Sequence, residues 1–142
     1  MALSADRMTP KQAVFGGCAL PVAANTRIYQ GSIVIVKNDG YAYPASNSAT
    51  TNVVMGVAKK GVDNTTATGG TGANGSKWVE VEWGIFEFAA TSIAQTAVGV
   101  QMYVVDDQTF DETGSNNVEC GVCVEYTSST KGKVFIQPGG FL

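Results

Sequence analysis

Hydrophobic and polar positions alternate along this chain in short runs that polar turns separate, a pattern typical of β-strands. The run WVEVEWGIFEF is the clearest example, because Val79 and Val81 share one face of the predicted strand. The alternation shifts after Gly84, where Phe86 and Phe88 form the better core pair. We therefore predict one strand over residues 78–88 with a β-bulge at Gly84.

Further runs of the same kind predict a sheet built from neighbouring hairpins. The turn signal Asn38-Asp39-Gly40 and the polar link TSSTKG each separate two such runs, so both are expected to close hairpins. Residues 91–97 form the one segment expected to make a helical turn. The remaining predicted strands cover residues 27–37, 41–43, 53–59, 101–106, 118–126 and 133–137.

The aliphatic composition supports the same fold class. Valine occurs 18 times and leucine 3 times, and branching at Cβ favours strands over helices. We predict an all-β domain over residues 26–142. Its core is expected to contain Val34, Val36, Val79, Val81, Trp83, Phe86, Val122, Val124, Val134 and Ile136.

One internal segment lacks the residues that a core needs. Residues 63–77 (DNTTATGGTGANGSK) contain four glycines and no apolar side chain larger than alanine. A phosphate-binding glycine loop would need a basic residue and a following helix, whereas a predicted strand follows here. We expect a flexible surface loop, with a binding role as the alternative.

Charge and side-chain chemistry exclude several functions. The net charge is −3, charged residues make up 15 % of the chain, and histidine is absent. An acidic chain is unsuited to direct binding of nucleic acid. Without histidine, neither histidine-based catalysis nor histidine-ligated zinc is possible. Glu80 and Glu82 lie two positions apart, which is the spacing of a solvated strand face rather than of an acid–base pair. We therefore expect no enzyme, no cofactor and no metal.

The three cysteines do not indicate a thiol site. Cys120 and Cys123 form a CxxC motif inside an alternating run, so their thiols are expected on opposite faces of a strand. A redox CxxC normally opens a helix, and Cys18 has no evident partner. We predict that thiol chemistry plays no part in function.

The first 25 residues have no clean periodicity. Asp6 lies where a secretory leader would be basic, and Gly16, Gly17 and Pro21 interrupt the apolar run, which argues against a signal peptide. No window has the roughly 18 apolar residues of a membrane span. Synthesis in a cytoplasm and no membrane partner are therefore expected. Residues 1–25 are predicted to form an extended arm, and the alternative is that residues 13–24 form an edge strand of the domain.

The order of these motifs resembles the capsid cement or head-decoration proteins of tailed phages. The resemblance covers roughly residues 27–137 and rests on GVAKKG, VEVEWGIFEF, GVQMYVVDD and ECGVCVEYTSSTKGKVFIQPG. It implies a compact β-barrel-like or β-tulip domain on the outer surface of a virion head, bound to the major capsid protein. A homo-oligomer is implied, a trimer ahead of a dimer. The alternative is a phage adaptor or fibre-type module that binds a protein or glycan surface.

This resemblance also suggests where the capsid would be contacted. Decoration proteins of this kind use an arm to reach a neighbouring subunit, in some cases by adding a strand to a sheet edge. Val14 and Phe15 would then fill pockets on the capsid, and Arg7 and Lys11 would meet acidic groups. These four residues are the predicted capsid contacts.

Overall fold

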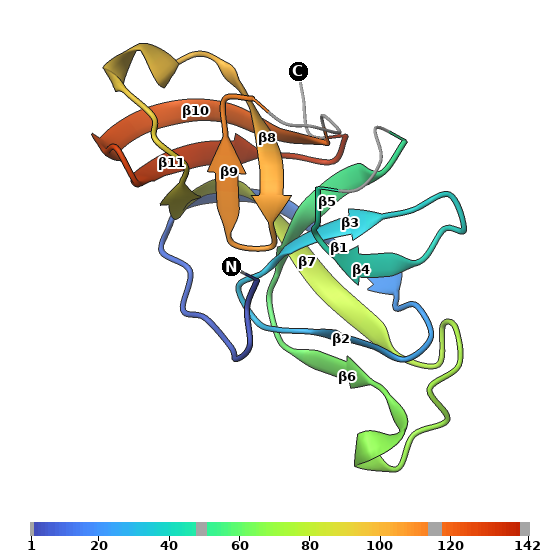
Figure 1. The fold of residues 1–142 in the computed structure, drawn as a ribbon. Coiled ribbons are helices and arrows are strands. Elements are labelled where there is room, and N and C mark those ends of the chain that lie inside the picture. The colour runs from blue at the N-terminus through green and yellow to red at the C-terminus, as the bar shows by residue number, and fades with distance from the viewer. Residues whose placement is uncertain (1, 48–50, 114–117, 140–142) are drawn as a thin grey trace.

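The computed structural model describes residues 2–47, 51–113 and 118–139, and the predicted domain end at 140–142 lies outside them. Within these ranges the chain is all-β, with eleven strands, two 3₁₀ turns and no helix of seven or more residues (Figure 1). The predicted fold class is confirmed. The strands are β1 (Lys11–Pro21), β2 (Thr26–Ile28), β3 (Ile33–Val36), β4 (Ala42–Pro44), β5 (Val53–Ala58), β6 (Val62–Asn64), β7 (Trp78–Ala90), β8 (Gln101–Asp106), β9 (Thr109–Asp111), β10 (Glu119–Ser128) and β11 (Lys131–Ile136). The 3₁₀ turns are η1 (Thr66–Thr68) and η2 (Gln95–Ala97), the second of which lies in the predicted helical turn.

Five strands close into a barrel. Strand β7 pairs with β9, β9 with β8, β8 with β10, β10 with β11, and β11 again with β7. The β7–β9 pair is parallel and the others are antiparallel. Fully buried large side chains fill the interior, among them Phe86, Phe88, Met102, Phe110 and Ile136. Closure leaves these five strands with no unpaired sheet edge along most of their length.

Strand β7 continues beyond the barrel and organises a second layer. Its first half pairs with β1 on one side and with β5 on the other, and the sheet continues through β3 to β4. A smaller core lies on this half, and the β2–β6 pair runs alongside it (Figure 1). Its buried members are Val22, Ile28, Val34, Ala42, Ala58, Val79 and Val81.

The predicted shift of pattern at Gly84 is confirmed. Val79 and Val81 are buried before this residue, and Phe86 and Phe88 are buried after it. The β1–β7 register is irregular on both sides of Gly84, and the extra residues lie on β1. Gly84 has a φ of +157°, and a Cβ there would collide with the carbonyl oxygen of Ala13. Only glycine allows the two backbones to approach so closely.

A second irregularity, at Gly121, overturns part of the predicted core. The β8–β10 register shifts between Glu119 and Gly121, so that Cys123 rather than Val122 points inward. The prediction that the two CxxC thiols face opposite sides is therefore wrong: Cys120 and Cys123 are both buried in the barrel core. Four predicted core residues are half-buried or exposed: Val36, Trp83, Val122 and Val124.

Two strand predictions need correction. The predicted strand over 27–37 is divided into β2 and β3, because a turn in which Ser32 N–H donates to the Tyr29 carbonyl interrupts it. Strand β9 was not predicted, because its acidic neighbours are typical of a turn. Asp106 accepts from the Gln108 N–H, and this turn brings Thr109–Asp111 beside β7. Both hairpins are confirmed, β3–β4 and β10–β11.

The amino-terminal segment is part of the domain rather than a separate arm. Residues 11–21 form β1, which is the edge-strand alternative. The preceding residues are also tied down: Leu3 N–H donates to Asp107, Arg7 N–H donates to the Gln30 carbonyl, and Glu87 N–H donates to the Pro10 carbonyl. These backbone hydrogen bonds replace the ones that an unpartnered terminus would make with water.

The segment 63–77 is anchored by a buried side chain. Asn64 is 1 % exposed, and its amide nitrogen donates to the carbonyls of Val22, Ala23 and Ala73 at 2.8–3.2 Å. Its amide oxygen accepts from Ser76 Oγ at 2.6 Å. The expectation that this segment buries nothing is wrong, because a polar side chain can be buried when its hydrogen bonds are satisfied.

Candidate interaction surface

Strand β1 is a long strand with one unpaired edge. Among the described strands it pairs with β7 alone. Its first residue, Lys11, is the only charged residue of the strand. Two large apolar side chains are exposed, Val14 by 44 % and Phe15 by 62 %. Long edges of this kind are usually protected by charged residues, proline or a covering element. Pro21 at one end and the register irregularities at Gln12 and Phe15 give only partial protection.

The structure separates the four predicted capsid contacts into three places. Arg7 is half-buried against the barrel, where its guanidinium donates to the Glu87 carbonyl at 3.2 Å and lies 4.9 Å from the centre of the Phe88 ring. Burial lowers the Arg7 pKa, which the nearby Glu87 carboxylate partly offsets. Lys11 and Val14 lie beside a groove, and Phe15 packs against the barrel wall. Arg7 is thus occupied within its own domain.

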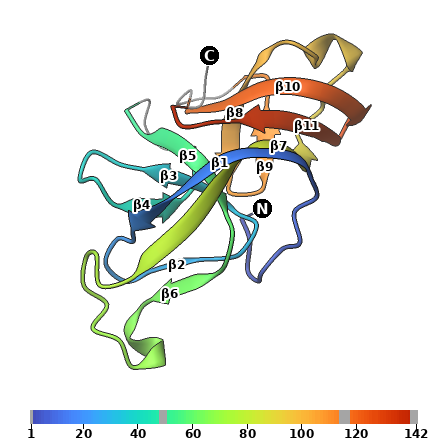
Figure 2. The same cartoon turned by 180° about the vertical axis from the view of Figure 1, so that it is seen from behind.

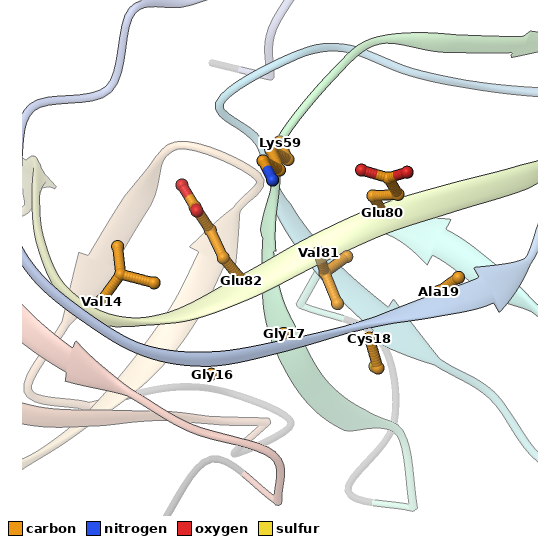
Figure 3. A pocket seen from close by; sticks show the side chains of 9 residues that line it. All are labelled: Val14, Gly16, Gly17, Cys18, Ala19, Lys59, Glu80, Val81 and Glu82. Carbon is orange, nitrogen blue, oxygen red and sulfur yellow. The ribbon is translucent and has the colours of Figure 1, made fainter.

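The groove crosses the face of the β1–β7 pair and has a volume of about 370 Å³ (Figure 3). Gly16, Gly17 and Ala19 line one side of it and, with little or no side chain, leave this space open. Lys59 from the end of β5, with Glu80 and Glu82 from β7, lines the opposite side. These elements fix the groove, since the Lys59 N–H donates to the Glu80 carbonyl at 2.8 Å.

The groove offers recognition rather than a set of reactive groups. Lys11 Nζ lies 2.9 Å from Glu82 Oε1, so one of the two carboxylates is already paired with a cation. Glu80 and Glu82 come from the same strand face, as predicted. Throughout the described ranges, no group of three or more histidine, cysteine or acidic side chains could hold a metal ion.

The thiols are poorly suited to nucleophilic or redox chemistry. Burial raises the pKa of Cys120 to about 12 and raises the pKa of Cys18 as well. Burial also raises the pKa of Cys123, partly offset by a backbone hydrogen bond from Glu125. A thiol with a raised pKa is protonated near neutral pH, and it is the thiolate that attacks or ligates.

A second surface feature was not predicted from the sequence. Three strands of the barrel wall place Ile85, Val122 and Phe135 side by side on the outer face, in register. Val122 and Val124 are predicted core residues because the alternation of β10, continued through Gly121 without a shift, places them inward. The signal in the sequence is the glycine itself, because a glycine inside an alternating run, as at Gly84, indicates a possible shift of register.

In the described part of the chain, no helix has the length and apolar character needed to cross a membrane.

The similarity of this chain to known proteins is low. No family model matches the sequence, and no curated protein matches it. A solved structure, the base of the head fibre protein gp8.5 of bacteriophage phi29, resembles the chain with a TM-score of 0.46 and 16 % identity. The alignment covers 86 % of this chain and 95 % of that one.

Proposed function

We propose that this chain is a structural protein of a phage virion. It binds the outer surface of an assembled head and stabilises the head by bridging subunits of the major capsid protein. The observation that carries the proposal is the unpaired edge of β1 with its exposed Val14 and Phe15. The sequence motifs that resemble head-decoration proteins supply the identity of the partner.

The proposed contact is made by β1 and the groove beside it. An extended segment of the capsid protein could pair with the regular half of β1, residues 16–21, because an exposed strand edge offers backbone donors and acceptors. Lys11, Val14 and Phe15 would contact the same partner. Arg7 is left out, since its guanidinium is engaged within the domain.

Such a protein needs no reactive chemistry. A ligand that binds the assembled shell in preference to free subunits stabilises the shell by mass action. Bridging two subunits adds avidity, because the second contact forms at high effective concentration. A non-enzymatic role is therefore part of the proposal.

The test uses heads that lack this protein. Wild-type chain should co-sediment with the heads and raise the temperature at which they rupture. Val14→Asp should weaken binding by at least about 10-fold, because it places a carboxylate in an apolar contact. Val53→Asp is the matched control, since Val53 is 39 % exposed on β5, away from β1. Both variants should melt within a few degrees of wild type.

The fibre-type alternative predicts a different result. A module that recognises a host protein or glycan would fail to stabilise heads and would bind host cells instead. Wild-type chain that binds cells but not heads would overturn the capsid proposal. Equal binding of heads by wild type and Val14→Asp would overturn the assignment of the contact to β1.

A further inference from the structure

The first turn of the pattern in β7 exposes an aromatic ring beside a carboxylate. Trp78 and Glu80 are both exposed, Trp78 by 58 %. Val79 and Val81 are buried, so Trp78 and Glu80 share the outer face of the strand. Their Cα atoms lie about 7 Å apart, which is twice the rise per residue of a strand. We call these two residues the β7 end site.

The rest of the domain shows what an aromatic ring beside a carboxylate binds in this protein. Three rings each carry a cation over one face, 4.2–4.9 Å from the ring centre, and each cation also interacts with a nearby carboxylate. The face of an aromatic ring is electronegative, so ring and carboxylate attract the same positive group. The three sets are Arg7 over Phe88 with Glu87, Arg27 over Tyr29 with Asp63, and Lys37 over Tyr43 with Asp39.

The β7 end site has the ring and the carboxylate without a cation from its own chain. Within the described ranges, no lysine or arginine lies over the Trp78 ring, and no ion pair involves Glu80. Glu82 differs, because Lys11 is paired with it at 2.9 Å. Lys59 lies beside Glu80, since its N–H donates to the Glu80 carbonyl, but its ammonium forms no ion pair with a described carboxylate. Tryptophan is also the ring that attracts a cation most strongly.

Strand β1 leaves a path to this site from its free edge. Figure 2 shows β1 lying alongside β7, and Figure 3 shows Glu80 and Glu82 on one side of β7 with Val81 on the other. A segment that pairs with β1 lies one strand away from β7. The β1 residues opposite Glu82 and Glu80 are Gly17 and Ala19, which are exposed and small. The stem of a long side chain can therefore cross β1 over them, while its charged head reaches the site.

We propose that the β7 end site binds an arginine side chain of the capsid segment that pairs with β1. The inference rests on the proposed function for the identity of that segment. A guanidinium is planar, so it stacks on the indole and donates to the carboxylate, whereas an ammonium is a point charge. An acidic side chain would be repelled by Glu80, and an apolar one would bury the carboxylate without a partner.

The first experiment measures binding to heads that lack this protein. Trp78→Ala should weaken binding by at least about 10-fold, and Trp78→Phe by less, because phenylalanine is a weaker cation-binding ring. Glu80→Gln should weaken binding by about 5-fold. Circular dichroism establishes that each variant is folded, and Trp78→Phe carries the test if Trp78→Ala is not.

Two matched controls remove similar groups elsewhere. Val98→Ala removes an apolar side chain that is 40 % exposed at the end of η2, and Glu119→Gln removes an exposed carboxylate of β10. Both should change head binding by less than about twofold, since neither residue lies on β1 or β7.

The sign of the partner's charge is tested at Lys59. Lys59→Met keeps most of the stem and removes a positive charge beside Glu80, so it should tighten head binding by about twofold or more if the partner group is a cation. Glu80→Gln should act in the opposite direction. Weaker binding by Lys59→Met together with tighter binding by Glu80→Gln would show an anionic partner and overturn the proposal.

The second experiment needs no heads. The chain has two tryptophans, so Trp83→Phe leaves the indole N–H signal of Trp78 alone in an NMR spectrum. The probes are the peptide acetyl-Val-Arg-Val-amide and the same peptide with citrulline, which has nearly the shape of arginine but no charge. The arginine peptide should shift the Trp78 signal at a concentration at least about 10-fold lower than the citrulline peptide does. Glu80→Gln should remove most of this difference.

The two experiments separate this inference from the proposed function. Heads bound equally by wild type, Trp78→Ala and Glu80→Gln would overturn the arginine contact and leave the proposed function standing. A Trp78 signal that does not distinguish the two peptides would also overturn it. A chain that distinguishes the peptides but ignores heads would support the arginine contact and overturn the capsid as its source.

Discussion

The two ends of the molecule are held together by different forces. The barrel of β7 to β11 is filled by large apolar side chains, with Phe86, Phe88 and Phe110 fully buried. The other end contains β2, β6 and residues 63–77, and its long loop has no large apolar residue. There Asn64 alone donates to three backbone carbonyls from three different positions. Apolar packing spreads stability over many residues, whereas the segment 63–77 relies on hydrogen bonds, three of which one buried amide donates.

This difference predicts how each end responds to substitution. A core of many side chains loses stability in proportion to the volume that is removed. Deletion of a buried amide that donates to several carbonyls removes all of those hydrogen bonds at once. The following predictions test that contrast, from the largest expected effect to the smallest.

Gly121→Val should have the largest effect, because a side chain at this position disrupts the pairing of β10 with β11 that helps to close the barrel. Gly121 has a φ of +154°, and a Cβ there would collide with the Phe135 carbonyl oxygen. We expect a loss of more than about 4 kcal/mol of unfolding free energy, which few single substitutions reach. Gly40→Ala is the control, because Gly40 also has a positive φ but open space around it. It should cost about 1 kcal/mol in urea denaturation. Equal losses for the two variants would contradict the close-approach argument.

Phe86→Ala should remove about 3–5 kcal/mol, since the ring is 1 % exposed in the barrel core. Trp83→Ala, three residues earlier on β7, should remove only about 1–2 kcal/mol. The Trp83 ring is half-buried and lies over Gly16 on the outer face rather than in the core. Thermal and urea unfolding of both variants measures the difference. A larger loss for Trp83→Ala would reverse the assignment of inner and outer faces.

Asn64→Ala should cost about 1–3 kcal/mol, because the Ala23 carbonyl loses its donor, whereas the carbonyls of Val22 and Ala73 keep the Gly75 and Ser76 N–H groups. Asn74→Ala is the matched control from the same segment. Asn74 accepts one exposed hydrogen bond, from the Ala24 N–H, so its removal should cost less than about 1 kcal/mol. If Asn64→Ala unfolds like wild type, the segment is held by something other than this amide.

The smallest effect concerns Asp107 at the edge of the barrel. Burial raises its pKa, Asp106 raises it further, and the hydrogen bond from Leu3 N–H works in the opposite direction. A carboxyl whose pKa is higher in the folded state stabilises the fold below its unfolded pKa, near 3.9. That contribution is lost as the pH rises through the folded pKa. Asp107→Asn keeps the acceptor oxygen and removes the charge, so its melting temperature relative to wild type should rise as the pH increases from 4 to 7. A constant difference over that range would contradict the burial argument.

Much of the barrel could be predicted from local pattern. Strands that are apolar on one face must bury that face, so the alternation in β7, β8 and β11 identified them. The shift at Gly84 could be seen in the sequence because large aromatic residues lie on both sides of it. The shift at Gly121 could not be seen in the same way. Cysteines lie on the inner face of β10 and valines on the outer face, and both residue types fit either register.

The candidate surfaces depended on contacts between residues far apart in the chain. The sequence showed that residues 13–24 are apolar and uncharged, which is compatible with an arm or with an edge strand. Only pairing with β7, more than 55 residues away, decides between them. The anchoring of residues 63–77 by Asn64 needs carbonyls from residues 22 and 23, and the outer row of Ile85, Val122 and Phe135 needs three strands in register. Alternation is a local property set by the backbone period of two, whereas burial of a polar group or alignment of an outer row depends on which strands become neighbours.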